Sequence, residues 1–265
     1  MTDSSQLRIA LWQCESRPGS VTHNLGRLAA TAAAAAARSA DLLITPEMYV
    51  TGYAIGADAR RLADPVSGPI ADAVGAIART ERIAILYGCP QRGSDGAVYN
   101  AIHLVANDGK MLATHHKTHL YGELDRRMVE AGSVPPPVVA LDGWQLGLMT
   151  CYEVEFPELV RSLAVRGAEV VCVPTANMIE FDAVQSVLLP ARALENQVYV
   201  AYANYCGAEA DLTYGGLSEM VSPTGRMVGS AGRSPQLTVV DAVRDDLLRS
   251  RAEYTYLRDR RPELY

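Results

Sequence analysis

Residues 146–159 read LGLMTCYEVEFPEL, and this stretch has the pattern of a functional site. An apolar run ends at Cys151, a short acidic turn follows, and Pro157 opens a segment with helical periodicity. The pattern predicts a strand that carries a thiol into a sharp turn before a helix, where backbone N–H groups and the helix N-terminus favour a thiolate. Taken alone, however, a cysteine at the end of an apolar run is more often a buried structural residue than a nucleophile.

The same strand and helix rhythm extends to both sides of this stretch. Apolar runs predict strands at 7–13, 41–45, 83–89, 97–105, 110–115, 138–141, 144–150, 169–174 and 198–203. Alanine-rich or periodic segments predict helices at 22–40, 69–80, 157–166, 183–197 and around 243–250. The helix over 183–197 must either tolerate Pro190 or begin there, and the long polar segment 118–137 is predicted to be a functional loop.

Alternating helices and apolar strands indicate an α/β protein, whereas the turn signal Asn107-Asp108-Gly109 indicates antiparallel pairing. Two mixed sheets packed face to face, each covered by helices, satisfy both signals. No change in composition marks a linker, so we predict a single domain over residues 1–265.

Composition restricts the classes of function. The 265 residues are 49% hydrophobic and 20% charged with a net charge of −6, and no basic run precedes the mixed-charge tail, so nothing attracts nucleic acid or an anionic membrane. A small-molecule substrate is more consistent with this composition than a nucleic acid or a membrane. Five widely spaced cysteines predict free thiols in a reducing compartment. The polar segment 1–7 lacks the pattern of a signal peptide and no apolar run is long enough to span a bilayer, so we expect a soluble, cytoplasmic protein.

Three chemically useful residues each follow an apolar strand-like run, namely Glu47, Lys117 and Cys151. In α/β folds, sites assemble at the carboxyl ends of strands, so these residues are able to converge. A carboxylate beside a thiol acts as a general base, and a lysine stabilises the charge that develops on a carbonyl oxygen after attack. Taken singly, Glu47 is as well explained as a solvated turn residue and Lys117 as a surface lysine.

Three motifs resemble those of the nitrilase superfamily of carbon–nitrogen hydrolases, in the order of that family. They are PEMYVTGY at 46–53, HKTHL at 116–120 and CYEVEFPE at 151–158. The resemblance continues through 167–169, 173–175, 192–196, 222–225 and the tail 260–265, and it covers nearly the whole chain.

The resemblance implies an α-β-β-α sandwich that forms a homodimer or higher homo-oligomer across its cysteine-bearing face, with residues 251–265 as a tail that reaches over the partner. It also implies that Glu47 deprotonates Cys151, whose thiolate attacks an amide carbon. Lys117 and the backbone N–H of Tyr152 would stabilise the oxyanion. The implied reaction requires no metal and no organic cofactor.

The family carries a second acidic residue in the loop after the lysine. Counting back from Gly132 places it at Asp125, although Glu123 is close enough to substitute for it. Met128 and Ala131 depart from the residues that related sequences tend to have in this loop. Adjacency to the motifs also indicates pocket residues, which are Tyr53, Tyr121, Tyr152, Asn177 and Met178. Core packing explains Met178 equally well.

The residues after Cys151 resemble amidases more than true nitrilases, so hydrolysis of a small-molecule amide to carboxylate and ammonia is the leading interpretation. A nitrilase or an N-carbamoyl amide hydrolase is the alternative within the superfamily, and a binding or scaffold protein without turnover is the alternative outside it. Glu153 takes the place where amidases mostly have aspartate, and the sequence assigns it no role. A zinc site at His115, His116 and His119 is disfavoured because no cysteine pair or glutamate accompanies them at ligand spacing.

Overall fold

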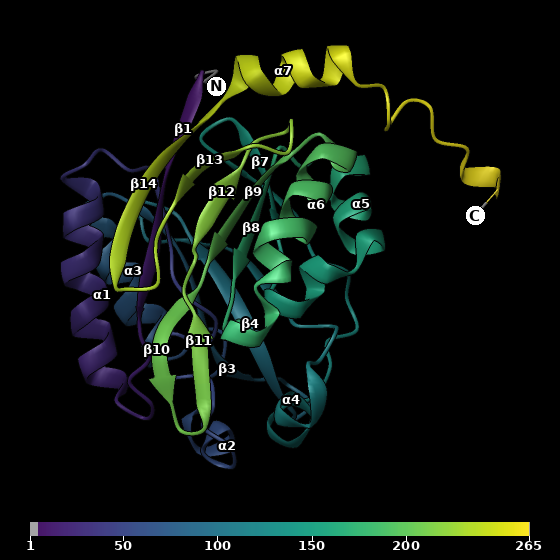
Figure 1. The fold of residues 1–265 in the computed structure, drawn as a ribbon. Coiled ribbons are helices and arrows are strands. Elements are labelled where there is room, and N and C mark those ends of the chain that lie inside the picture. Colours follow the sequence, from purple (N-terminus) through teal and green to yellow (C-terminus); the bar gives the residue numbers. More distant parts are fainter. Residues whose placement is uncertain (1–4, 265) are drawn as a thin grey trace.

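A computed structural model of the chain describes residues 5–264 (Figure 1). The first four residues of the polar segment 1–7 and Tyr265 at the end of the predicted tail lie outside the described residues.

Eight strands form the first sheet, and β1 (Gln6–Glu15) is its central strand. On one side β1 pairs in parallel with β2; on the other side it pairs antiparallel with β14 and then, through its last residues, in parallel with β10. The order across the sheet is β11 (Leu212–Gly215), β10 (Tyr205–Glu209), β1, β2 (Leu42–Ile44), β3 (Ala84–Arg92), β4 (Val98–Val105) and β5 (Met111–His116), with β14 (Gln236–Val243) beside β10 along β1.

Six strands form the second sheet, which is parallel at its centre and antiparallel at both edges. Its order is β13 (Met227–Ser230), β12 (Glu219–Val221), β9 (Tyr199–Ala203), β8 (Val170–Pro174), β7 (Trp144–Leu148) and β6 (Val138–Leu141). The quoted stretch supplies β7, so the cysteine lies at the end of a strand of this second sheet.

The two sheets pack face to face through an apolar core. Leu7, Ile9 and Leu11 of β1 point into this core together with Leu146 and Leu148 of β7. Alternate residues of β1 point to the opposite face, as the twofold periodicity of a strand requires. Each fully buried leucine or isoleucine contributes roughly 1.5–3 kcal/mol, so this interface is a major source of stability.

Helices cover both outer faces, as Figure 1 shows. On the first sheet lie α1 (Val21–Ala36) and α3 (Pro69–Glu81), and on the second lie α5 (Pro157–Val165) and α6 (Leu189–Asn196). Ala32 and Ala35 of the alanine-rich segment are fully buried, because side chains this small let α1 lie close to the sheet. The structure confirms the predicted α-β-β-α sandwich of two mixed sheets.

Several predicted boundaries were wrong. The segment 118–137 is not all loop, because it contains α4 (Gly122–Met128), a polar helix that buries Asp125 and Met128. The short helix α2 (Asp58–Leu62) was missed, and α1 ends at Ala36 rather than at residue 40. A helix of five to seven residues has fewer than two turns, so its sequence shows too little periodicity to predict it. Such a helix is stabilised by packing against the rest of the protein and not by helix propensity. Before Pro190 the chain forms the π-helical turn η3 (Val184–Leu188), so α6 begins close to the proline.

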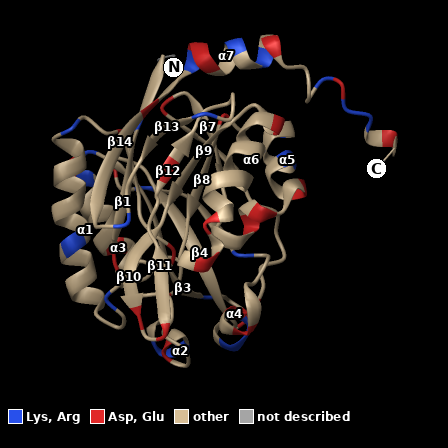
Figure 2. Ribbon diagram, viewed as in Figure 1, with Lys and Arg blue, Asp and Glu red and all other residues tan. Residues whose placement is uncertain are grey.

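The chain ends in α7 (Arg244–Glu253) and a segment that extends away from the sandwich, with one short turn η4 (Pro262–Leu264) (Figure 1). The helix therefore continues to Glu253, beyond the predicted boundary at residue 250. Charges of both signs gather on α7, whereas the strands of the two sheets are almost free of charged residues (Figure 2). Across residues 5–264, none of the helices has the length and apolar character needed to cross a bilayer.

Candidate active site

The structure brings the three strand ends together where the two sheets meet. Glu47 follows β2 and Lys117 follows β5 in the first sheet, while Cys151 follows β7 in the second. Lys117 Nζ donates a hydrogen bond to Glu47 Oε1 at 2.8 Å. Glu47 and Lys117 are fully buried, and the cysteine is 9% exposed. Their burial excludes the alternatives of a solvated turn glutamate and a surface lysine.

Lys117 lies between two carboxylates. Its ammonium group also donates to Asp125 Oδ2 at 2.7 Å. Asp125 is held in turn by the hydroxyl of Tyr53, which donates to Oδ1 at 2.8 Å, and by the backbone N–H of Tyr121, which donates to Oδ2 at 2.8 Å. Burial alone would lower the pKa of Lys117, but the charges of Glu47 and Asp125 outweigh it and raise that pKa well above its ordinary value. The lysine is therefore a fixed cation.

Of the two acidic residues considered for the loop, the structure places Asp125 against Lys117. Asp125 is fully buried on α4. Glu123 is exposed, and its nearest ion-pair partner is Arg127 on the same helix, at 3.7 Å. The shorter side chain of aspartate reaches the lysine because α4 carries it inward.

Glu47 has one satisfied oxygen and one that is left over. Oε1 accepts from Lys117 and from Asn100 Nδ2 at 2.7 Å. Within residues 5–264, Oε2 has no N–H or O–H donor, so it is available to the thiol of Cys151. A hydrogen bond with the Cys151 side chain lowers the pKa of the Glu47 carboxyl. Burial nevertheless raises the pKa of Glu47 above its ordinary value, and Lys117 opposes this increase only in part. A carboxylate in this condition accepts a proton readily.

Cys151 is the first residue of the 3₁₀ turn η1 (Cys151–Glu155) and has a φ of +49°. A residue other than glycine in this left-handed region is strained by about 1–2 kcal/mol. In α/β-hydrolases, a strained turn between a strand and a helix presents the nucleophile in the same way. Burial and then the charge of Glu47 raise the pKa of the Cys151 thiol, while Lys117 lowers it. The resting thiol is therefore protonated at neutral pH and needs a base.

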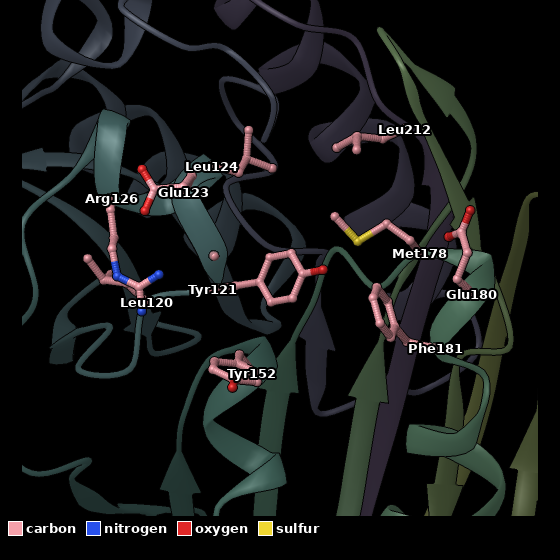
Figure 3. Close-up of a pocket in the computed structure, with 11 residues that line it drawn as sticks. Leu120, Tyr121, Glu123, Leu124, Arg126, Tyr152, Met178, Glu180, Phe181 and Leu212 are labelled. Carbon is pink, nitrogen blue, oxygen red and sulfur yellow. The ribbon is translucent and has the colours of Figure 1, made fainter.

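A cavity of about 730 Å³ lies beside the cysteine turn (Figure 3). Tyr121 and Tyr152 meet edge to face in it, with ring centroids 5.6 Å apart, and Phe181 packs against Tyr121 in the same way. Burial, and after it the neighbouring Cys151, raises the pKa of the Tyr121 hydroxyl. The lining is formed by Leu120, Tyr121, Gly122, Glu123, Leu124, Arg126, Tyr152, Met178, Glu180, Phe181 and Leu212.

Of the five predicted pocket residues, Tyr121, Tyr152 and Met178 line this cavity. Tyr53 lies behind it, where it is 1% exposed and bonded to Asp125. The side chain of Asn177 is also buried, and it donates to the Phe181 carbonyl at 3.2 Å and to Gln185 Oε1 at 3.1 Å. Asn177 thus holds the segment that carries Met178 and Phe181 rather than lining the cavity.

Sequence reasoning missed Asn100, which lies on β4 beside Lys117. The backbone N–H of Lys117 donates to the Asn100 carbonyl at 2.9 Å, while the Asn100 side chain donates to Glu47. An asparagine in the apolar run 97–105 was the available signal, because a buried amide needs partners. It also missed Thr175 and Ala176 after β8, whose hydrogen bonding toward the thiol lowers the pKa of Cys151.

Comparison with known proteins identifies the family of this chain. The family model described as carbon-nitrogen hydrolase matches residues 8–252. A protein of Pseudomonas protegens called "Hydrolase in pqqF 5'region" is 48% identical over 98% of this chain and 90% of its own length. The (R)-stereoselective amidase of a Pseudomonas species is 36% identical over 96% of this chain and 92% of its own length.

Solved structures agree. An amidase from Nesterenkonia sp. AN1, in a mutant that carries the acetamide moiety of fluoroacetamide on its active-site cysteine, superposes with a TM-score of 0.89. It is 38% identical, and the match covers 100% of this chain and 97% of that one. The matches in sequence and in structure both extend over nearly the whole chain, and the chain therefore belongs to the carbon-nitrogen hydrolase family.

Proposed function

We propose that this protein is an amidase that hydrolyses the amide bond of a small molecule to a carboxylate and ammonia through a thioester on Cys151. One observation carries the proposal: the thiol lies beside a buried carboxylate with an unused oxygen and beside a buried lysine that is held as a cation. The amidases among its relatives support it.

The first step is attack on the amide. Glu47 Oε2 takes the proton from the Cys151 sulfur, and the sulfur forms a bond to the carbonyl carbon as the π electrons of the carbonyl move onto oxygen. Because the thiol is protonated at rest, the base has to remove its proton for the attack to occur. A base whose pKa is raised above its ordinary value suits this transfer.

The oxyanion then needs donors. Lys117 Nζ supplies one, and the backbone N–H of Tyr152 supplies the other, since a helix start leaves its first N–H groups without an intrahelical acceptor. The tetrahedral intermediate collapses as Glu47 returns the proton to the leaving nitrogen, and ammonia departs. Water, deprotonated by Glu47, attacks the thioester, and the thiolate leaves and regains its proton.

Asp125 contributes through Lys117. Its carboxylate accepts from the ammonium group, and its own orientation is fixed by Tyr53 and Tyr121. Two flanking carboxylates keep the lysine charged and aligned in a site from which water is excluded, where a preorganised charge acts most strongly. This is the role that we propose for the second acid.

The cavity supports an uncharged amide with an apolar acyl group. Aromatic and aliphatic side chains make up most of its wall, and its charged side chains are Glu123, Arg126 and Glu180 (Figure 3). Two carboxylates against one guanidinium disfavour a substrate with an additional carboxylate.

We also propose that the chain acts as a homo-oligomer. This proposal rests on the resemblance to the family, and the exposed apolar side chains of Val165 at the end of α5 and Val187 in η3, which are 54% and 59% exposed, are compatible with it. The proposals for the tail 251–265 and for the cytoplasmic location rest on the sequence alone.

The test is a panel of aliphatic, aromatic, ω-dicarboxylic and carbamoyl amides, with matched nitriles, assayed for ammonia. We expect ammonia from neutral amides and the slowest release from dicarboxylic ones. Ammonia from nitriles alone would overturn the proposal in favour of a nitrilase. Rapid labelling of Cys151 by iodoacetamide, with protection by a small amide, supports an enzyme, whereas an inert thiol supports the scaffold alternative.

A further inference from the structure

Glu153 is a third fully buried carboxylate close to the cysteine, after Glu47 and Asp125, and the mechanism does not use it. Its two oxygens accept four hydrogen-bond donors. Thr150 N donates at 2.7 Å, Thr118 N at 2.8 Å, Thr118 Oγ1 at 2.6 Å, and His115 Nε2 at 2.9 Å to the nearer oxygen. No other acidic side chain described above has so complete a set of donors.

These donors come from the two segments that carry the reacting groups. His115 and Thr118 flank Lys117 at the end of β5, and Thr150 immediately precedes Cys151. Glu153 itself follows Tyr152 in η1. The carboxylate therefore joins the lysine strand of the first sheet to the cysteine turn of the second, across the gap between the sheets.

The charge of Glu153 is favoured by this environment. Burial would raise its pKa, but the hydrogen bonds and the charge interaction from His115, together with those from Thr118, outweigh burial and lower the pKa. The ionised carboxylate accepts at both oxygens at once. A neutral amide of the same shape would place an NH₂ group against one of the donors.

We propose that Glu153, with His115 as its partner, is a positioning residue that sets the oxyanion donors relative to each other. The two donors are Lys117 Nζ and Tyr152 N–H, and each lies one or two residues from a group that Glu153 binds. The inference rests on the proposed amidase function. It assigns Glu153 no contact with substrate and no proton transfer.

The consequence is specific to the step that develops negative charge on oxygen. Donors that are displaced by even 1 Å stabilise a transition state much less, at a cost of roughly 10²-fold in rate. Alkylation of a thiol by iodoacetamide displaces iodide at carbon and forms no oxyanion, so it needs the base but not the two donors. Misplaced donors therefore slow hydrolysis and spare alkylation.

The test is Glu153→Gln in the full chain. We expect kcat for a neutral amide to fall by roughly 10- to 100-fold with KM within about threefold, as for supporting residues of other sites. The rate of Cys151 alkylation should stay within about threefold of the wild type. The matched control is Glu169→Gln, which removes another buried carboxylate of the second sheet, bonded to Arg244 at 2.5 Å and to Gln145 N at 2.9 Å, and should leave kcat unchanged.

Two results would overturn the inference. One is a Glu153→Gln enzyme with wild-type kcat, and the other is a parallel loss of hydrolysis and alkylation, which would indicate collapse of the cysteine turn. A wild-type protein that releases ammonia from no amide would instead refute the proposed function.

His115→Phe gives a second, milder test in case the glutamine variant does not fold. It removes one of the four donors and keeps the carboxylate, so kcat should fall by a smaller factor with alkylation again spared. The two changes act on one contact, so the double variant should lose less than the product of the single losses. Independent effects would contradict a shared role.

Discussion

Two buried glutamates lie near Cys151, and the protein holds them in opposite ways. Glu47 and Glu153 are equally inaccessible to solvent. Glu47 has partners at one oxygen and a raised pKa. Glu153 has donors at both oxygens and a lowered pKa. The difference shows that burial does not determine what a carboxyl group does, because the number of donors determines whether its charge is tolerated.

The contrast distinguishes a carboxyl group that transfers protons from one that holds two segments of the chain together. A group that must gain and lose a proton in each cycle needs a site in which neither form is strongly favoured. A group that links two segments needs one permanent form with every oxygen satisfied. We therefore expect substitutions of Glu47 and Glu153 to have different effects on activity and on stability.

The largest effect is expected from Glu47→Gln, which removes the base and keeps the shape. We expect kcat/KM for a neutral amide to fall by about 10³-fold or more, in the upper range for a general base. Cys151→Ala should abolish ammonia release and serve as the baseline. Circular dichroism and thermal melts should show both variants folded. If Glu47→Gln keeps more than a tenth of the activity, or if Cys151→Ala remains active, the mechanism is wrong.

Lys117→Met should affect both activity and stability. Without the ammonium, Glu47 and Asp125 are two buried carboxylates that share no cation, and breaking a buried pair costs about 3–5 kcal/mol. Urea unfolding at pH 7 should show this loss, together with the loss of ammonia release. The matched control is Lys110→Met, because that exposed lysine pairs with Asp108 on the surface and its removal should leave the melting temperature unchanged. A stable Lys117→Met protein would show that the two carboxyls are neutral in the fold.

The smallest effect is the pH dependence of stability. Because the pKa of Glu153 is lowered in the fold, its contribution is complete above its unfolded pKa of about 4.3 and disappears as the pH falls through the folded value. The difference in free energy of unfolding between wild type and Glu153→Gln should therefore be constant from pH 7 to 5. Below about pH 4.3 it should shrink, by at most about 1.4 kcal/mol for each pH unit.

The pKa of Glu47 is shifted in the opposite direction, and the pH dependence of kcat/KM should show this shift. Its pKa is raised, so the acid limb of kcat/KM should lie above the ordinary glutamate value of about 4.3. Urea unfolding and kcat/KM across the same pH series provide both readings. A stability difference that does not change down to pH 3.5, or an acid limb below pH 4, would break the comparison between the two residues.

Much of this site could be predicted from the sequence, because the end of a strand is a local feature of the chain. Glu47, Lys117 and Cys151 each follow an apolar run, and their order and motifs resemble one family. Asn100 and the pair of His115 and Glu153 could not be found in this way. Their roles depend on side chains that meet from separate strands or from separate sheets, and no spacing along the chain records such a meeting.

The segment 118–137 shows the same limit. Its polar composition predicted a loop, and only docking shows why a helix forms there: α4 buries Asp125 against Lys117. A helix of seven residues has little stability of its own, so its contacts with the rest of the protein determine whether it forms.

The α/β rhythm and the thiol at the end of β7 follow from the sequence, because hydrophobic periodicity and turn residues act over a few neighbouring positions. The α-β-β-α sandwich was implied by the resemblance of the three motifs to one family. The tertiary structure alone decided the protonation preferences of the two glutamates. Those preferences depend on how many donors reach each oxygen and on the absence of water, and both are set only when the two sheets close over Cys151.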